Sequence, residues 1–143
     1  MTSESSKLAR GREFTRRTEP ERVAITPCNT YEREQVASAV DQAVGLLGGW
    51  ERLVPVDEEI YIKPNLAGPF APERAVTTHP MVVETVARTL RSKGADIIIG
   101  DGPAGVPSTT YLKLVYKRTG MTSLGNRLNI PIDYDTTPEE ITI

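Results

Sequence analysis

The chain has 143 residues, of which 38% are hydrophobic and 25% are charged, and its 17 Lys and Arg against 19 Asp and Glu leave a net charge of −2. This balance is typical of one globular domain, and the near-neutral charge argues against general nucleic-acid binding. One cysteine and one histidine exclude an internal disulfide, a four-cysteine cluster and a multi-histidine metal site. No apolar run reaches the roughly 18 residues of a membrane-spanning helix, so we expect no membrane span.

The first segment, residues 1–21, is polar, charged and without periodicity, which predicts a disordered tail. Its Arg16-Arg17 pair resembles a twin-arginine export signal. Such a signal needs an apolar stretch after the pair, and residues 18–22 are polar or charged. We therefore expect a cytoplasmic protein, with which the free thiol of Cys28 is consistent.

The next segment begins a strand–helix alternation. Val23–Ile25 is a short apolar run ended by Pro27, which predicts a buried strand. A helix is predicted over residues 31–47, since apolar residues recur at helical spacing and Gly48-Gly49 follows as a stop. The predicted apolar face consists of Val36, Val40, Ala43 and Leu47.

A second strand is predicted over residues 59–63, which Pro64 closes. A second helix is predicted to start near Thr78–Pro80, because proline is tolerated in a first helical turn, and to end at Gly94. Its predicted apolar face consists of Val83, Val86, Ala87 and Leu90. Residues 97–99 are three isoleucines, apolar on both faces, which predicts a central strand of a parallel sheet.

The last predicted elements are a helix over residues 108–119, capped by Ser108 and stopped by Gly120, and a fourth strand over residues 130–134. The alternation predicts an α/β domain over residues 22–143, with a mostly parallel sheet and helices on both faces in three layers. The right-handed crossover rule fixes the hand of each unit. Connections of this length keep consecutive strands parallel, so every strand–helix loop lies at one edge of the sheet, where ligands of open α/β sheets bind.

Polar side chains of the loops and helix starts are expected to converge at that edge. The candidates are Lys63, Asn65, Thr77, Thr78, His79 and Asp101. These residues are distant in sequence, and they meet only if the second and third predicted strands are neighbours.

Each candidate also has a structural explanation. Lys63 either holds a carboxylate or phosphate, or extends to solvent from a strand end. At Thr77, Thr78 and His79, the unpaired N–H groups of a helix start attract anions, the hydroxyls add donors and the imidazole titrates near neutrality. Alternatively, one threonine caps the helix, the other turns the loop and His79 sits in the first turn.

The stretch 100–105 is rich in glycine, yet it matches neither a phosphate-binding P-loop nor the dinucleotide fingerprint. Asp101 within it either coordinates a metal, acts as a base or pairs with Lys63, or it simply forms an Asp-Gly turn. A nucleophilic pair of Cys28 with His79 is a further option, whereas a partly buried, inert thiol is the default expectation.

Three blocks occur in a familiar order: Ile60–Leu66 with K-P-N-L, Ala75–Val83 with T-T-H-P-x-V-V, and Ile97–Pro103 with G-D-x-P. With them the chain resembles domain-of-unknown-function family 362 (DUF362), and residues 22–143 resemble its amino-terminal half. The resemblance implies little about activity, because members are largely uncharacterised. Many carry a ferredoxin-like module with four-iron clusters, which suggests electron transfer or redox enzymology.

The chain departs from that family because it has no cysteine-rich module and lacks the P-K-x-K-T-H and K-N-x-x-G stretches that usually follow. We therefore expect an incomplete domain that self-associates or needs a partner chain. One hypothesis is a redox-linked or small-molecule enzyme half. In it, Lys63 and the helix start hold an anionic ligand, His79 exchanges protons and Asp101 orients a group or a metal. The alternative is a non-catalytic α/β domain that binds a partner chain. The sequence specifies neither a substrate nor a cofactor.

Overall fold

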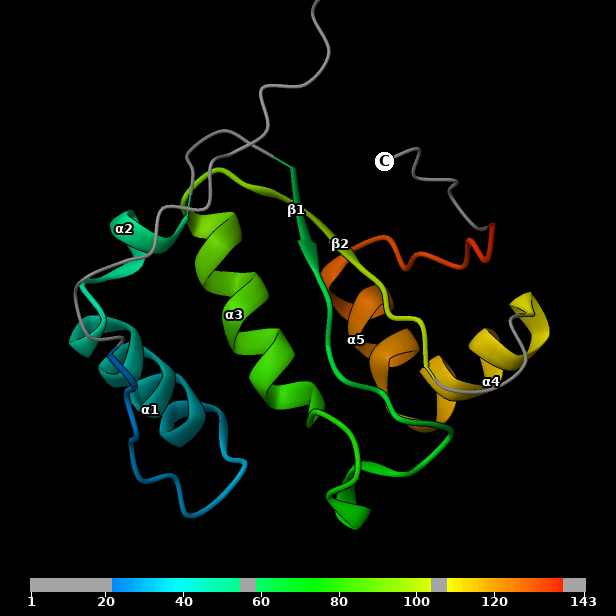
Figure 1. Cartoon of the computed structure of the whole chain (residues 1–143), viewed down its shortest axis with the longest axis horizontal. Helices are drawn as coiled ribbons and strands as arrows, with labels where there is room; N and C mark the ends of the chain where they lie inside the picture. Colours follow the sequence, from blue (N-terminus) through cyan, green and yellow to red (C-terminus); the bar gives the residue numbers. More distant parts are fainter. Residues whose placement is uncertain (1–21, 55–58, 104–107, 138–143) are drawn as a thin grey trace, which may run out of the picture.

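The computed structural model describes residues 22–54, 59–103 and 108–137, so the predicted tail over residues 1–21 lies outside the described residues. Figure 1 shows the arrangement of the elements. In chain order they are α1 (Arg33–Leu46), α2 (Trp50–Leu53), β1 (Glu59–Ile62), a 3-10 helix (Pro72–Arg74), α3 (Pro80–Ser92), β2 (Asp96–Ile99), α4 (Thr109–Arg118) and α5 (Met121–Leu128). Helices and a small parallel sheet together confirm the predicted α/β character.

The sheet has β1 and β2 as parallel neighbours, with Glu59 opposite Asp96 and Ile62 opposite Ile99. An isolated parallel bridge joins Ile99 to Ile132 on the other side of β2. Strand β2 therefore has β1 on one side and this single bridge on the other, and the predicted fourth strand is reduced to the bridge.

The strand predicted at Val23–Ile25 is wrong. These residues form no strand in the structure, and Val23 and Ile25 are 84% and 88% exposed. The chain at this point is held to α1 instead, because the hydroxyl of Thr26 donates to the carbonyl of Ala39 at 2.9 Å. An apolar triplet becomes a strand only where a neighbouring strand accepts its backbone hydrogen bonds.

Helices α1, α3 and α4 fall where periodicity predicted them. Ser108 caps α4, since its side chain accepts from the amide of Tyr111, and Gly48 and Gly94 follow α1 and α3 with positive φ angles of 110° and 92°. Sequence analysis missed α2 and α5. Helix α5 begins directly after Gly120. The positive φ of Gly120, 83°, lets the chain turn from the end of α4 into α5.

The core lies where β1 and β2 meet α3, α4 and α5. Its completely buried side chains include Ile99, Tyr116, Met121 and Leu124. Helix α1 packs against α3, as Figure 1 shows at the side of α3 away from β1. The carboxyl ends of both strands continue into the loops after Ile62 and Ile99.

Candidate functional site

Two predicted site residues, Lys63 and Asp101, follow the ends of β1 and β2 and are bonded to each other. The Lys63 ammonium donates to Oδ1 of Asp101, and the other carboxylate oxygen accepts from the amide of Leu66 at 2.8 Å. The side chain of Lys63 is 65% exposed, whereas that of Asp101 is 3% exposed. A buried carboxylate thus anchors a lysine whose remaining surface faces solvent.

The backbone at Asp101 is fixed by Tyr116 of α4. The phenol oxygen accepts from the Asp101 amide at 2.7 Å and donates to the Asp101 carbonyl at 3.0 Å. Burial raises the pKa of Tyr116, so the phenol is neutral and keeps the proton that it donates. The core helix α4 therefore sets the position of the carboxylate.

The other pair of predicted residues, Asn65 and Thr78, joins the loop after β1 to the segment before α3. The Thr78 amide donates to the Asn65 carbonyl at 2.9 Å, and the Thr78 hydroxyl accepts from the Asn65 amide at 3.0 Å. Because Asn65 is two residues from Lys63, the three sequence segments of the predicted site are tied together at one end of the sheet.

Thr77 lies next to this connection and is 8% exposed. Its hydroxyl has no hydrogen-bond partner within the described residues. A buried hydroxyl without a partner is unfavourable by about 1–3 kcal/mol, which makes it an unusual feature for a helix-preceding loop.

His79 is the N-cap of α3, which corrects the prediction that a threonine caps the helix and His79 sits in the first turn. Its Nδ1 accepts from the amide of Met81 at 3.1 Å, and its ring stacks on Tyr31 with centroids 3.6 Å apart. Burial lowers the pKa of His79, and the charge of Glu73 opposes this only in part. The imidazole is therefore neutral near pH 7, with its proton on Nε2.

The start of α3 has its donors engaged within the chain. Pro80 has no N–H, the Met81 amide donates to His79, and the Val82 amide donates to the His79 carbonyl at 3.0 Å. The helix-start amides of Met81 and Val82, which the sequence suggested as anion donors, therefore already have acceptors within the chain.

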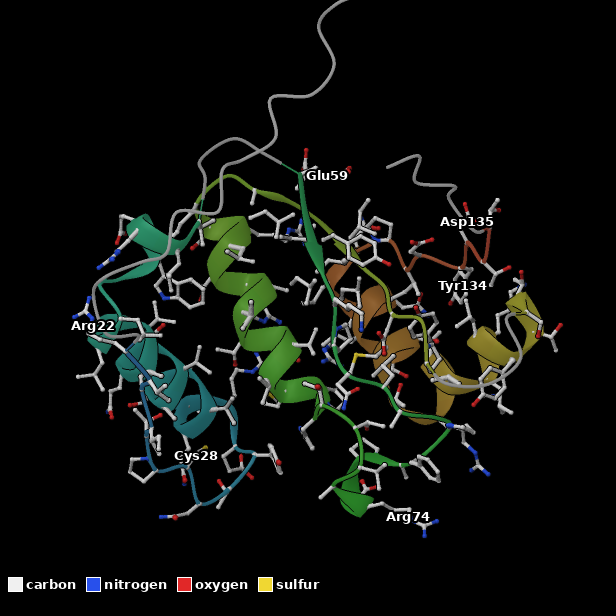
Figure 2. All side chains as sticks on the ribbon, viewed as in Figure 1. Arg22, Cys28, Glu59, Arg74, Tyr134 and Asp135 are labelled. Carbon is white, nitrogen blue, oxygen red and sulfur yellow. The ribbon has the colours of Figure 1, made fainter. Side chains whose placement is uncertain are left out.

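A cavity of about 360 Å³ opens at the same edge, beyond Asp101. Asp101 lines it together with Tyr61 of β1 and with Asp133 and Asp135, which follow the bridge at Ile132. Figure 2 shows Asp135 on the side of the molecule away from α1. Of the predicted site residues, Asp101 alone is among the lining residues of this cavity, so the cavity is not a site that all of them share.

Sequence analysis missed Tyr61 and Asp133, whose side chains are bonded at 2.9 Å, the phenol donating. Burial, and then the Asp133 carboxylate, raise the pKa of Tyr61. The sequence signal that could have revealed this contact is Gly100. A Cβ at that position would stand 1.8 Å from the Tyr61 hydroxyl and 2.9 Å from Cβ of Asp133. A glycine that ends a strand can therefore indicate a side chain passing directly over it.

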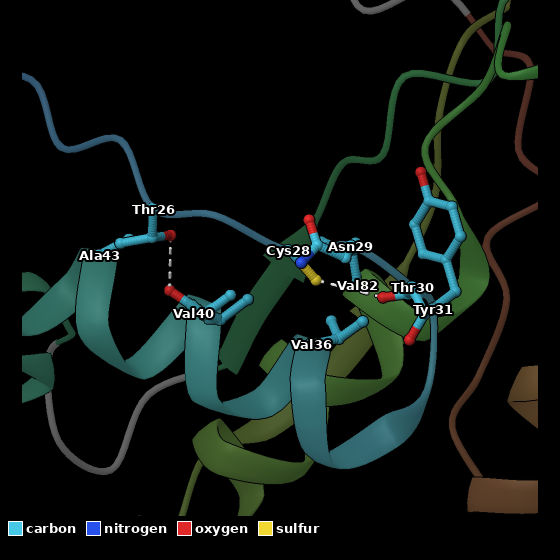
Figure 3. Close-up of a pocket in the computed structure, with 10 residues that line it drawn as sticks. Thr26, Cys28, Asn29, Thr30, Tyr31, Val36, Val40, Ala43 and Val82 are labelled. Atoms are coloured by element: carbon cyan, nitrogen blue, oxygen red, sulfur yellow. Dashed lines mark hydrogen bonds between the residues drawn. The ribbon is translucent and has the colours of Figure 1, made fainter.

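A second cavity, of about 350 Å³, lies between residues 26–31, α1 and Val82 of α3 (Figure 3). Cys28 is at its rim and is exposed, which corrects the expectation of a partly buried thiol. The thiol donates to the Thr30 carbonyl at 3.2 Å, whereas His79 is engaged with Tyr31 and α3. The two side chains of the suggested nucleophilic pair thus have separate partners.

Within the described part of the chain, no group of three or more His, Cys, Asp or Glu residues is arranged to hold a metal ion. Among its helices, none has the length and apolar character needed to cross a membrane.

Comparison with known proteins gives one family and one relative. Residues 60–143 match the model of DUF362, described as a domain of unknown function. The chain is 28% identical over 110 residues to the thylakoid-associated protein sll1697 of Synechocystis, a match that covers 77% of this chain and 33% of the relative. The match thus spans about a third of the relative's length. No solved structure matches the chain.

Proposed function

This chain belongs to the DUF362 family, and we propose that it is the ligand-binding part of a longer protein, in which Lys63 binds a small anion at the carboxyl edge of β1 and β2. The observation that carries the proposal is the asymmetry of the Lys63–Asp101 pair, an exposed ammonium on a buried carboxylate. A lysine that merely satisfied a surface carboxylate would leave both groups in water.

The Lys63 ammonium has three N–H donors, and one is used on Asp101. Because the Leu66 amide holds the second oxygen of Asp101, the carboxylate is fixed and in turn holds the lysine in place. Asp101 is on this proposal a positioning residue, since both of its oxygens are engaged, and the free donors of Lys63 meet the ligand.

The neighbouring segment supports an anionic ligand through its hydroxyls. The Asn65–Thr78 connection holds residues 77 and 78 beside the loop that begins at Lys63. A ligand oxygen that reached the buried Thr77 hydroxyl would give it the partner it lacks among the described residues. On this proposal Asn65, Thr77 and Thr78 line the ligand's second side.

A chemical step by the longer protein is a further part of the proposal. Proton exchange by His79 would have to use Nε2, because Nδ1 caps α3. The redox or small-molecule activity that the family resemblance implies, the remainder of a three-layer domain and a cytoplasmic location also stay proposals for this chain. The name thylakoid-associated applies to the relative.

A second candidate function is binding of a partner chain, with no chemistry. The observation that favours it is the outer edge of β1, which pairs with no strand among the described residues. Edge strands of this kind add strands from other chains. Light scattering coupled to size-exclusion chromatography tests it: a dimer or larger species favours this candidate, and a monomer at every concentration contradicts self-association.

The anion proposal is tested by titrating the ¹⁵N-labelled chain with inorganic phosphate and with a small dicarboxylate while backbone amide signals are followed. We expect saturable shifts at Asn65, Leu66 and Thr78, with Gly45 in α1 as an unaffected reference. Shifts that never saturate, or that avoid all of these amides, would contradict the proposal.

A further inference from the structure

A second charged feature, the arginine cluster, joins three helices. It consists of Arg33 of α1, Arg88 of α3 and Arg127 of α5 around Glu84 of α3. Arg33 Nη2 and Arg88 Nε each lie 2.9 Å from Glu84 Oε1, and Arg127 Nη2 donates to Oε2. The Glu84 side chain is 1% exposed, whereas the three arginines are 51%, 46% and 49% exposed.

The charges in the arginine cluster do not balance. Three guanidinium groups carry +3 and Glu84 carries −1, which leaves +2 at one place on a chain whose net charge is −2. No other carboxylate of the described residues is within ion-pair distance of these arginines. One or two guanidiniums would satisfy a buried carboxylate, and the third adds repulsion between like charges.

The three guanidinium groups of the arginine cluster are half-exposed and keep unused donors. A guanidinium has five N–H groups, and each arginine uses one of them in its contact with Glu84. Since three helices bring these half-exposed groups to a single buried oxygen pair, the donors are held near one another without a bound ligand. Planar guanidinium forks suit the oxygens of a phosphoryl group, with which they form paired hydrogen bonds.

We infer that the arginine cluster binds a phosphoryl dianion, with Glu84 as the residue that positions the three arginines. A phosphate monoester or free phosphate near neutral pH carries close to −2, which would neutralise the +2 excess. The ligand chemistry is the same whether the group belongs to a soluble phosphate or to a phosphatidic acid headgroup. This site is independent of Lys63, which lies at the carboxyl edge of the sheet.

The test compares two arginine substitutions in the full chain. Arg33→Gln leaves two arginines on Glu84, so the fold is expected to survive, and circular dichroism checks this. Arg118→Gln removes an exposed arginine from the last turn of α4 and serves as the matched control. We expect Arg33→Gln to weaken phosphate binding, measured from amide shifts near Arg33 and Arg127, about tenfold or more, and Arg118→Gln to leave it unchanged.

Arg127→Gln is a second variant with the same expected loss, in case Arg33→Gln unfolds. Vesicles of phosphatidylcholine with and without phosphatidic acid separate the sources: binding of phosphate supports a soluble ligand, and binding of the phosphatidic acid vesicles alone supports a headgroup. Equal binding by Arg33→Gln, Arg127→Gln and Arg118→Gln would overturn the inference, as would binding of neither probe. A Lys63 variant is expected to leave these results unchanged. The experiments can therefore contradict the arginine-cluster site and the carboxyl-edge site independently of each other.

Discussion

The phenol of Tyr116 and the backbone of Asp101 form a closed pair of hydrogen bonds, 2.7 Å from the Asp101 amide and 3.0 Å to its carbonyl. Tyr116 is completely buried in the core. This contact makes the position of the Asp101 carboxylate, and with it that of Lys63, a consequence of how α4 packs on the sheet.

Tyr116→Phe is therefore expected to destabilise the fold by about 1–3 kcal/mol, because it leaves a buried amide and a buried carbonyl without their partner. Urea unfolding measures the change. Tyr31→Phe is the control, since Tyr31 is 55% exposed, and little change is expected there. Equal stability of both variants would show that the Asp101 backbone does not depend on Tyr116.

Gly100→Ala tests the close passage of Tyr61 over the end of β2. The new Cβ would stand 1.8 Å from the Tyr61 hydroxyl, so Tyr61 must move from the position in which it donates to Asp133. We expect a loss of about 1–3 kcal/mol or more. Gly102→Ala is the matched control two residues away, where a Cβ meets nothing within 4 Å. A thermal midpoint for Gly100→Ala equal to that of Gly102→Ala would contradict the observed packing.

The pH dependence of stability near neutrality tests the environment of His79. Since burial lowers its pKa in the folded chain, the unfolded chain binds the proton more readily, and stability is lost as pH falls from the unfolded pKa of about 6.5 towards the folded value. His79 is the one histidine of the sequence. His79→Asn keeps an N-cap side chain and is expected to remove this loss between about pH 7.5 and pH 5.5. An unchanged pH profile would mean that His79 is not buried as described.

Glu84→Gln is expected to destabilise the chain by about 1–3 kcal/mol, because a neutral amide replaces the charge that three half-exposed arginines share. Burial raises the pKa of Glu84, but hydrogen bonds from Arg88 and Arg127 outweigh it and leave the pKa below its ordinary 4.5.

The sign of the pH effect follows from this lowered pKa. The stabilisation by Glu84 is present above the unfolded pKa and is lost as pH falls through the folded pKa. Chemical unfolding at a series of pH values from about 5 to 3 measures it. The wild-type chain should lose stability more steeply than Glu84→Gln, whereas the exposed control Glu59→Gln should follow the wild type. Parallel curves for wild type and Glu84→Gln would contradict the ion-pair network.

Local signals in the sequence predicted the helices with clear periodicity. Helix α3 has its apolar face and its glycine stop within one segment, and α4 has Ser108 as a cap and Gly120 as a stop. Helix α5 has Met121, Leu124 and Leu128 at helical spacing, but it is short, has Gly125 in its interior and has no side-chain cap to mark its start. The strand expected at Val23–Ile25 failed because pairing depends on a distant edge, which a local pattern does not report.

The candidate site was predictable in part. Parallel pairing of β1 with β2 brings Lys63 to Asp101, which topology alone implies. The contacts made by Tyr116, Tyr61 and Asp133 depend on the packing of side chains between elements, and no spacing rule reveals them. The role of His79 as N-cap was hidden because histidine is an uncommon capping residue compared with the threonines beside it.

The most direct test of the central claim measures phosphate affinity in two variants that differ only at Lys63. Asp101→Asn keeps an acceptor for the Leu66 amide and leaves Lys63 without its counter-charge. Adding Lys63→Met to this variant removes the ammonium without leaving a buried carboxylate unpaired. Titration with phosphate, followed at the Asn65, Leu66 and Thr78 amides so that the arginine cluster does not contribute, should show saturable binding by Asp101→Asn and binding about tenfold or more weaker by the double variant. Equal affinity of the two variants would contradict an anion site built on Lys63.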